Sequence, residues 1–202
     1  MLLNNHKPSS AKIKSRLPHS RFYGVDMRSR LLIINCPSAY FVHLPMGSFG
    51  LSDYLNRQEI PVRILNLALY DRSQTASVLN HYLDQFQPTH VGLIFHWQEI
   101  AEGVLWAGEH VRSRMDEAKI ICGGFTAGYF GEALLEKCPF VDYVVKGDPQ
   151  RPLELLMKGA EPTEIPNLIY RDGTGVRANK ASYLDRQRGH FRHLLFQINV
   201  SI

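Results

Sequence analysis

Residues 118–128 read AKIICGGFTAG, and this stretch decides the fold class. The apolar run at 118–122 is typical of a buried β-strand. Two glycines then end the strand abruptly, before a segment with helical spacing that we place at 127–137. The same succession of a short apolar strand and a longer mixed segment recurs along the chain. The other predicted strands are 31–35, 62–67, 90–95 and 141–146, and the other predicted helices are 49–58, 73–86, 99–114 and 151–158.

Five strands that alternate with helices predict an α/β fold with right-handed crossovers. Nearly continuous apolar strands are buried on both faces, which favours a parallel sheet. We therefore predict a Rossmann-like, doubly wound, parallel five-stranded sheet of the flavodoxin-type order 2-1-3-4-5, with a small C-terminal hairpin around Asp172-Gly173. Ligands bind such sheets at the carboxyl ends of the strands, so the site is expected in the loops at 36–47, 96–98, 123–127 and 146–150.

Charge divides the chain of 202 residues, whose formal net charge is +4. Residues 1–30 hold seven Lys and Arg against one Asp, and 186–202 add three Arg, whereas 31–185 hold 13 basic and 18 acidic side chains. We predict a basic, flexible N-terminal arm (1–30), a ligand-binding domain (31–160), a hairpin extension or linker (161–185) and an atypical basic tail (186–202). Aromatic residues do not interleave with the basic ones, so a nucleic-acid partner is not expected.

The composition also predicts the compartment. No uninterrupted apolar stretch approaches the roughly 18–20 residues of a membrane span, and the N-terminus lacks the apolar core of a signal peptide. Three widely spaced cysteines do not suit a disulfide framework. These features predict a soluble cytoplasmic protein without a membrane partner.

The expected loops lack the motifs of common enzymes. No G-x-G-x-x-G follows the first strand, and neither a Walker Gly-Lys-Ser/Thr nor a G-x-S-x-G sequence occurs. A phospho-receiver would need acidic groups where Asn35 and His96 stand, although Lys146 is suitably placed. The histidines have no H-x-x-x-H and the cysteines no C-x-x-C spacing, so we assign no catalytic residue and no protein ligand to a metal. Cys122 is expected in the core, and Trp97 either stacks on a flat ligand or caps the core.

Five segments match a known family in order and with suitable spacing: LLIINCPS at 31–38, GLIFHWQ at 92–98, IICGGFTAGY at 120–129, VDYVVKGD at 141–148 and IPNLIYRD at 165–172. Over 31–185 they resemble the N-terminal cobalamin-binding-type domain of cobalamin-dependent radical S-adenosylmethionine enzymes. The resemblance implies that cobalamin is the cofactor, that its cobalt is the bound metal, and that the corrin lies over the carboxyl edge of the sheet. The cofactor contacts that it implies are Pro37, Ser38, His96, Trp97, Gln98, Gly123, Gly124, Phe125, Thr126, Gly147 and Asp148.

Two departures from the family pattern matter. Many cobalamin domains carry D-x-H-x-x-G after the first strand, but the nearest sequence here, His43-Leu44-Pro45-Met46-Gly47, has one residue too many, so no lower cobalt ligand is assigned. No cysteine lies beyond Cys138, so the C-x-x-x-C-x-x-C run that holds an iron–sulfur cluster is missing. An iron–sulfur cluster and S-adenosylmethionine are therefore not expected in this chain.

These departures leave three interpretations. The first is a truncated or stand-alone cobalamin-binding module that is not catalytic alone, with a separate radical S-adenosylmethionine core protein as a candidate partner for methyl transfer. The second is a degenerate interaction or regulatory domain that no longer binds cobalamin. The third is an enzyme acting on a nucleotide or sugar at the Gly123-Gly124 loop.

Overall fold

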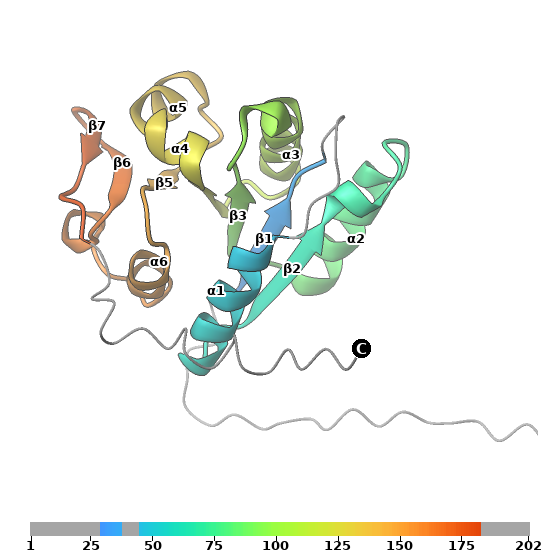
Figure 1. Ribbon diagram of the computed structural model, residues 1–202, viewed down its shortest axis with the longest axis horizontal. Helices are drawn as coiled ribbons and strands as arrows, with labels where there is room; N and C mark the ends of the chain where they lie inside the picture. The colour runs from blue at the N-terminus through green and yellow to red at the C-terminus, as the bar shows by residue number, and fades with distance from the viewer. Residues whose placement is uncertain (1–28, 38–44, 183–202) are drawn as a thin grey trace, which may run out of the picture.

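A computed structural model describes residues 29–37 and 45–182 of the chain (Figure 1). These residues form one seven-stranded sheet of order β2-β1-β3-β4-β5-β6-β7, with helices on both faces. The strands are β1 (Leu31–Asn35), β2 (Val62–Asn66), β3 (His90–Ile94), β4 (Lys119–Gly123), β5 (Tyr143–Val145), β6 (Leu168–Asp172) and β7 (Gly175–Ala178). The helices are α1 (Met46–Arg57), α2 (Thr75–Phe86), α3 (Ala101–Arg114), α4 (Phe125–Tyr129), α5 (Gly131–Lys137) and α6 (Gln150–Met157). Short 3₁₀ turns are η1 (Leu67–Leu69), η2 (Gln98–Ile100) and η3 (Pro162–Glu164).

The predicted α/β class is confirmed, but the prediction of a five-stranded sheet is wrong. Strands β1 to β5 pair in parallel, whereas β6 pairs antiparallel with β5, and β7 pairs antiparallel with β6. The predicted hairpin forms, yet it extends the main sheet instead of standing apart. The order of the whole sheet therefore differs from the predicted one.

Arg171 on β6 gives a physical reason for this extension. Its guanidinium donates hydrogen bonds to the carbonyl oxygens of Leu135, Cys138 and Val141, at the end of α5 and the start of the next connection. These acceptors include carbonyls that the end of a helix leaves without an intrahelical partner. Ile169 of the same strand is buried in the core, so the hairpin covers apolar surface as well as the β5 edge.

Two hydrophobic layers sandwich the sheet. One layer packs the apolar sides of α2, α3 and α5 against it, and the other packs α1 and α6 against the opposite face. Strand β1 lies near the middle and all five of its residues are buried. Each fully buried Leu or Ile contributes about 1.5–3 kcal/mol relative to an exposed one, so this strand anchors both layers.

Glu154 on α6 is a buried charge that links the two helices of one layer. Its carboxylate accepts hydrogen bonds from Tyr54 Oη of α1 at 2.6 Å and from Lys158 Nζ at 2.8 Å, and it lies 3.1 Å from Arg151 Nη1. Burial alone would raise the pKa of Glu154, but these donors outweigh it and hold the pKa at about 2. The ionised carboxylate thus stabilises the folded state.

His90 starts β3 at the opposite, amino-terminal edge of the sheet. Burial lowers its pKa to about 4, and the nearby Lys119 charge adds to the shift. The imidazole is therefore neutral in the folded protein near pH 7, with Thr89 Oγ1 at 2.9 Å from its Nδ1.

Most predicted domain boundaries stay predictions, since the arm and the tail fall largely on residues outside the described ranges. Within the described residues, none of the helices combines the length and apolar character that crossing a bilayer requires.

Candidate functional site

The carboxyl edge of the parallel strands brings two of the predicted loops into direct contact. Ala127 N donates to Phe95 O at 3.1 Å, and the Thr126 hydroxyl donates to His96 O at 3.0 Å. Strand β3 is locked to the end of β4 as well, because Phe95 N donates to Gly123 O at 2.7 Å. The loop after β3 and the turn after β4 therefore form one rigid unit.

Gly124 allows this close approach. Its φ is +114°, a conformation that L side chains rarely adopt. A Cβ on Gly124 would lie 2.6 Å from Phe95 O and 3.0 Å from His96 Cα, so a side chain here collides with backbone. Gly123 differs, because a Cβ there would meet no atom within 4 Å. The second glycine thus shapes the loop, and the first leaves open space at the edge.

Aromatic rings gather on this unit. The His96 ring centroid lies 4.7 Å from that of Trp97, nearly edge-on, and 4.6 Å from that of Phe125. Trp97 is 49% exposed and Phe125 is 74% exposed, so both rings face solvent to a large extent. We call His96, Trp97 and Phe125 the aromatic cluster. Of the two predicted roles for Trp97, its exposure fits stacking on a ligand better than capping the core.

The loop after β5 is the next part of the edge. A Cβ on Gly128 of α4 would lie 3.6 Å from Lys146 Cα, which places this loop beside the turn after β4. Gly147 has a φ of +82°, so it turns the chain where other residues would be strained. The backbone carbonyl of Asp148 accepts a long 3.4 Å hydrogen bond from Asn167 Nδ2.

Asn167 was not predicted as part of this edge. It is buried, has a φ of +63°, and also donates through Nδ2 to Ser182 O at 2.8 Å. Its backbone carbonyl oxygen accepts a hydrogen bond from Lys146 N at 2.9 Å. An Asn before an apolar strand signals a left-handed turn, and that signal in IPNLIY would have identified it.

The other predicted residues are placed as follows. Gln98 is exposed and begins η2. Pro37 lies two residues beyond β1, and its carbonyl oxygen packs closely on α3, where a Cβ on Gly103 would approach it to 2.3 Å. Asn35, at the end of β1, donates through Nδ2 to Asn66 Oδ1 of β2 at 2.8 Å. Ser38 and His43 lie outside the described residues.

The thiols near this edge belong to the core, as predicted for Cys122. Cys36 and Cys122 are both fully buried. Burial raises the pKa of the Cys122 thiol to about 12, and it raises that of Cys36 further above its ordinary value. Neither group is therefore a thiolate near neutral pH, so nucleophilic chemistry through them is not supported.

The described part of the candidate site carries exposed aromatic rings. Two hollows of the described residues, of about 390 and 690 Å³, are lined by residues other than the predicted cofactor contacts. An open edge with exposed rings and an uncovered glycine suits a broad, flat ligand better than a small enclosed one.

The fold is that of a Rossmann-like α/β domain, and the carboxyl end of its parallel strands is the candidate ligand surface. Two solved structures with this fold are of the radical S-adenosylmethionine methyltransferase TsrM from Kitasatospora setae. The one with cobalamin and a [4Fe–4S] cluster bound is 22% identical, with a TM-score of 0.67 over 81% of this chain and 30% of its own. The one with tryptophan substrate and the analogue aza-SAM is 22% identical, with a TM-score of 0.65 over 75% of this chain and 30% of its own.

A third neighbour is an apo structure of the cobalamin-dependent S-adenosylmethionine radical enzyme OxsB. It is 18% identical, with a TM-score of 0.58 over 77% of this chain and 22% of its own. No known family profile matches the sequence, and no curated protein matches it significantly. At these identities the likeness shows the fold, and the chain spans less than a third of each neighbour's length.

Proposed function

We propose that this chain is a cobalamin-binding module that holds the corrin against the carboxyl edge of its sheet. The observation that carries the proposal is the rigid unit formed by the loops after β3 and β4, with its exposed aromatic cluster beside the open Gly123. The structural neighbours support cobalamin as the ligand class, since one of the TsrM structures has cobalamin bound.

The residues at this edge fit a corrin in shape and in chemistry. Gly123 presents no side chain, so a flat macrocycle can approach the backbone there. The rings of Trp97 and Phe125 offer apolar contact, while the Gln98 amide offers a neutral partner for the amide side chains of the corrin and Gly147 and Asp148 lie on the neighbouring loop. When bound, cobalamin supplies cobalt for methyl-transfer or radical chemistry.

The role of this chain is binding and orientation. We assign no catalytic residue, and we propose that the radical step belongs to a core that carries the iron–sulfur cluster and S-adenosylmethionine, for which a separate protein is a candidate partner. The proposal for the chain itself does not depend on that partner.

Retention of corrin tests the proposal. Purified protein is incubated with hydroxocobalamin and desalted, and the corrin-to-protein ratio is read from the absorbance spectrum. We expect retention by the wild type and a clear loss in Trp97→Ala and Phe125→Ala, whose rings are 49% and 74% exposed. Leu105→Ala is the matched control, since Leu105 is a partly exposed apolar residue on α3 outside the edge. A wild type without retained corrin overturns the proposal, and equal retention in all variants overturns the assigned surface.

A cofactor-free interaction domain is the second candidate, and one observation favours it. Tyr129 is 83% exposed and Phe130 is 42% exposed, and their ring centroids lie 4.8 Å apart beside the aromatic cluster's Phe125 on α4. Exposed aromatic residues are enriched in protein interfaces. If the protein retains no corrin yet Tyr129→Ala abolishes co-elution with a purified radical S-adenosylmethionine core, this second function replaces the first.

A further inference from the structure

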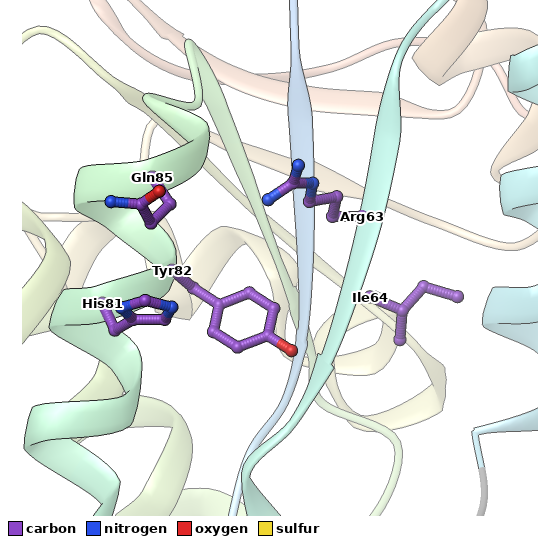
Figure 2. A pocket seen from close by; sticks show the side chains of 5 residues that line it. All are labelled: Arg63, Ile64, His81, Tyr82 and Gln85. Carbon is purple, nitrogen blue, oxygen red and sulfur yellow. The ribbon is translucent and has the colours of Figure 1, made fainter. Parts of the chain in front are cut away.

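A second concave surface lies at the free edge of the sheet, away from the candidate cofactor site. Strand β2 ends the strand order, and beside it a hollow of about 390 Å³ opens between β2 and α2 (Figure 2). It is lined by Arg63 and Ile64 of the strand and by His81, Tyr82 and Gln85 of the helix. This volume falls within the range of roughly 300–1,000 Å³ that is common for small-molecule sites.

Each of the four polar side chains around this hollow can donate a hydrogen bond. Arg63 reaches from β2 toward the face of α2 that carries His81 and Gln85, as Figure 2 shows. His81 and Gln85 are one helical turn apart, and Tyr82 contributes a hydroxyl between strand and helix. None of the five lining residues is acidic.

Arg63 has a positive charge, and among the described residues its guanidinium contacts an aromatic ring and not a carboxylate. Its guanidinium carbon lies 4.8 Å from the centroid of the Phe86 ring, a cation–π contact. In the part of the chain that the structure describes, Arg63 takes no part in an ion pair. The neighbouring carboxylate of Asp84 on α2 is bound to Arg114 instead. The guanidinium therefore keeps its N–H groups for a ligand.

We propose that this hollow is a binding site for a small organic oxyanion, a phosphate monoester or a carboxylate. The planar fork of a guanidinium matches two oxygens of either group, and the Phe86 ring restricts the side chain so that less freedom is lost on binding. His81, Tyr82 and Gln85 supply further donors for the anion, and the hollow is large enough to hold an organic body beside it. The competing explanation is that Arg63 only protects an exposed edge strand from pairing with other chains.

Titration of the full chain with phenyl phosphate and, separately, with benzoate tests this proposal by ¹H–¹⁵N NMR. We expect saturable shifts in the resonances of β2 and α2 with at least one probe, and the stronger probe identifies the anion. Arg63→Met should weaken binding by at least about tenfold, and Arg63→Lys should weaken it less because the charge remains. Gln85→Ala should weaken it by a smaller factor.

Arg57→Met is the matched control, because it removes the same charge from an exposed arginine that is paired with Asp53 on α1. Its affinity should stay within about twofold of the wild type. Thermal unfolding of each variant verifies the fold, which we expect to persist because Arg63 is exposed. The proposal is overturned if neither probe shifts these resonances up to about 10 mM, or if Arg63→Met and Arg57→Met bind alike. In the first case Arg63 serves the edge strand alone.

Discussion

Replacing Gly124 by Ala tests the geometry on which the candidate site depends. The new Cβ would lie 2.6 Å from Phe95 O, 2.8 Å from Phe95 C and 3.0 Å from His96 Cα. All three are backbone atoms, so no flexible side chain can move aside. The loop after β3 or the turn after β4 must shift, and the hydrogen bonds that join them must lengthen.

The cost of this substitution has two parts. A side chain in a left-handed or similar backbone conformation costs about 1–2 kcal/mol, and Gly124 has a φ of +114°. Overpacking typically costs a further 1–3 kcal/mol or so. We therefore expect Gly124→Ala to lower the free energy of unfolding by about 2–5 kcal/mol, which corresponds to a fall of roughly 4–20 °C in the unfolding midpoint for a domain of this size.

Gly123→Ala is the control, because it makes the same substitution one residue away. Its Cβ would meet no atom within 4 Å, so we expect stability within about 1 kcal/mol of the wild type. Urea unfolding followed by tryptophan fluorescence gives both values, and equal slopes establish that the comparison is sound. If Gly124→Ala is as stable as Gly123→Ala, the close contact between the two loops does not exist as described.

Three further predictions concern groups elsewhere in the fold. The pKa of His90 is about 6.5 in the unfolded state and about 4 in the folded protein, so acid favours the unfolded state. The free energy of unfolding should therefore fall by up to about 3 kcal/mol as the pH is lowered from the first value to the second. In urea unfolding, the free energy of unfolding of His90→Gln should depend less on pH. The pKa of Glu154 is lowered instead, so the stabilisation by its carboxylate is present above about pH 4.5 and is lost toward pH 2. Glu154→Gln should lower the free energy of unfolding by about 2–3 kcal/mol at pH 7 and by little at pH 2. An equal decrease at both pH values would contradict the role of the ionised carboxylate. Burial raises the thiol pKa of Cys36 and Cys122, so a chromogenic disulfide should label them far more slowly in the native protein than in urea, and equal rates would show that the core is open.

The elements could be predicted well because the strands are short and strongly apolar. Strand β1 begins and ends at the predicted residues, and most others differ by one or two. The predicted helix at 127–137 is divided at Phe130 into α4 and α5, with α4 beginning at 125. Gly131 lets the start of α5 pack closely on β6, since a Cβ there would lie 2.4 Å from Ile169 Cδ1. That contact joins distant parts of the chain, so the spacing of apolar residues within the predicted helix does not indicate it.

The extension of the sheet could not be predicted for the same reason. A hairpin signal identifies two paired strands but not the edge on which they lie. Here the edge is selected by the register of Tyr143 with Tyr170 and by the hydrogen bonds from Arg171 to the end of α5. At the site, the sequence indicates that the paired glycines lie at the ligand edge. Their separate roles follow from the structure, in which Gly124 lies against the backbone of Phe95 and Gly123 lies next to open space.

Two strongly perturbed titratable groups of the described residues serve the packing of the fold. Active sites tend to collect groups whose pKa values are displaced by burial and by charged neighbours. In the described part of the chain, carboxylates and histidines with clearly displaced pKa values include His90, His110, Glu154 and Asp172. His90 starts β3 at the other edge, and Glu154 connects α1 with α6, so these shifts reflect how the elements are held together. The carboxyl edge is distinguished by the backbone shape at Gly124 and by the exposed rings of Trp97 and Phe125, which are features that the proposed cofactor-binding module needs.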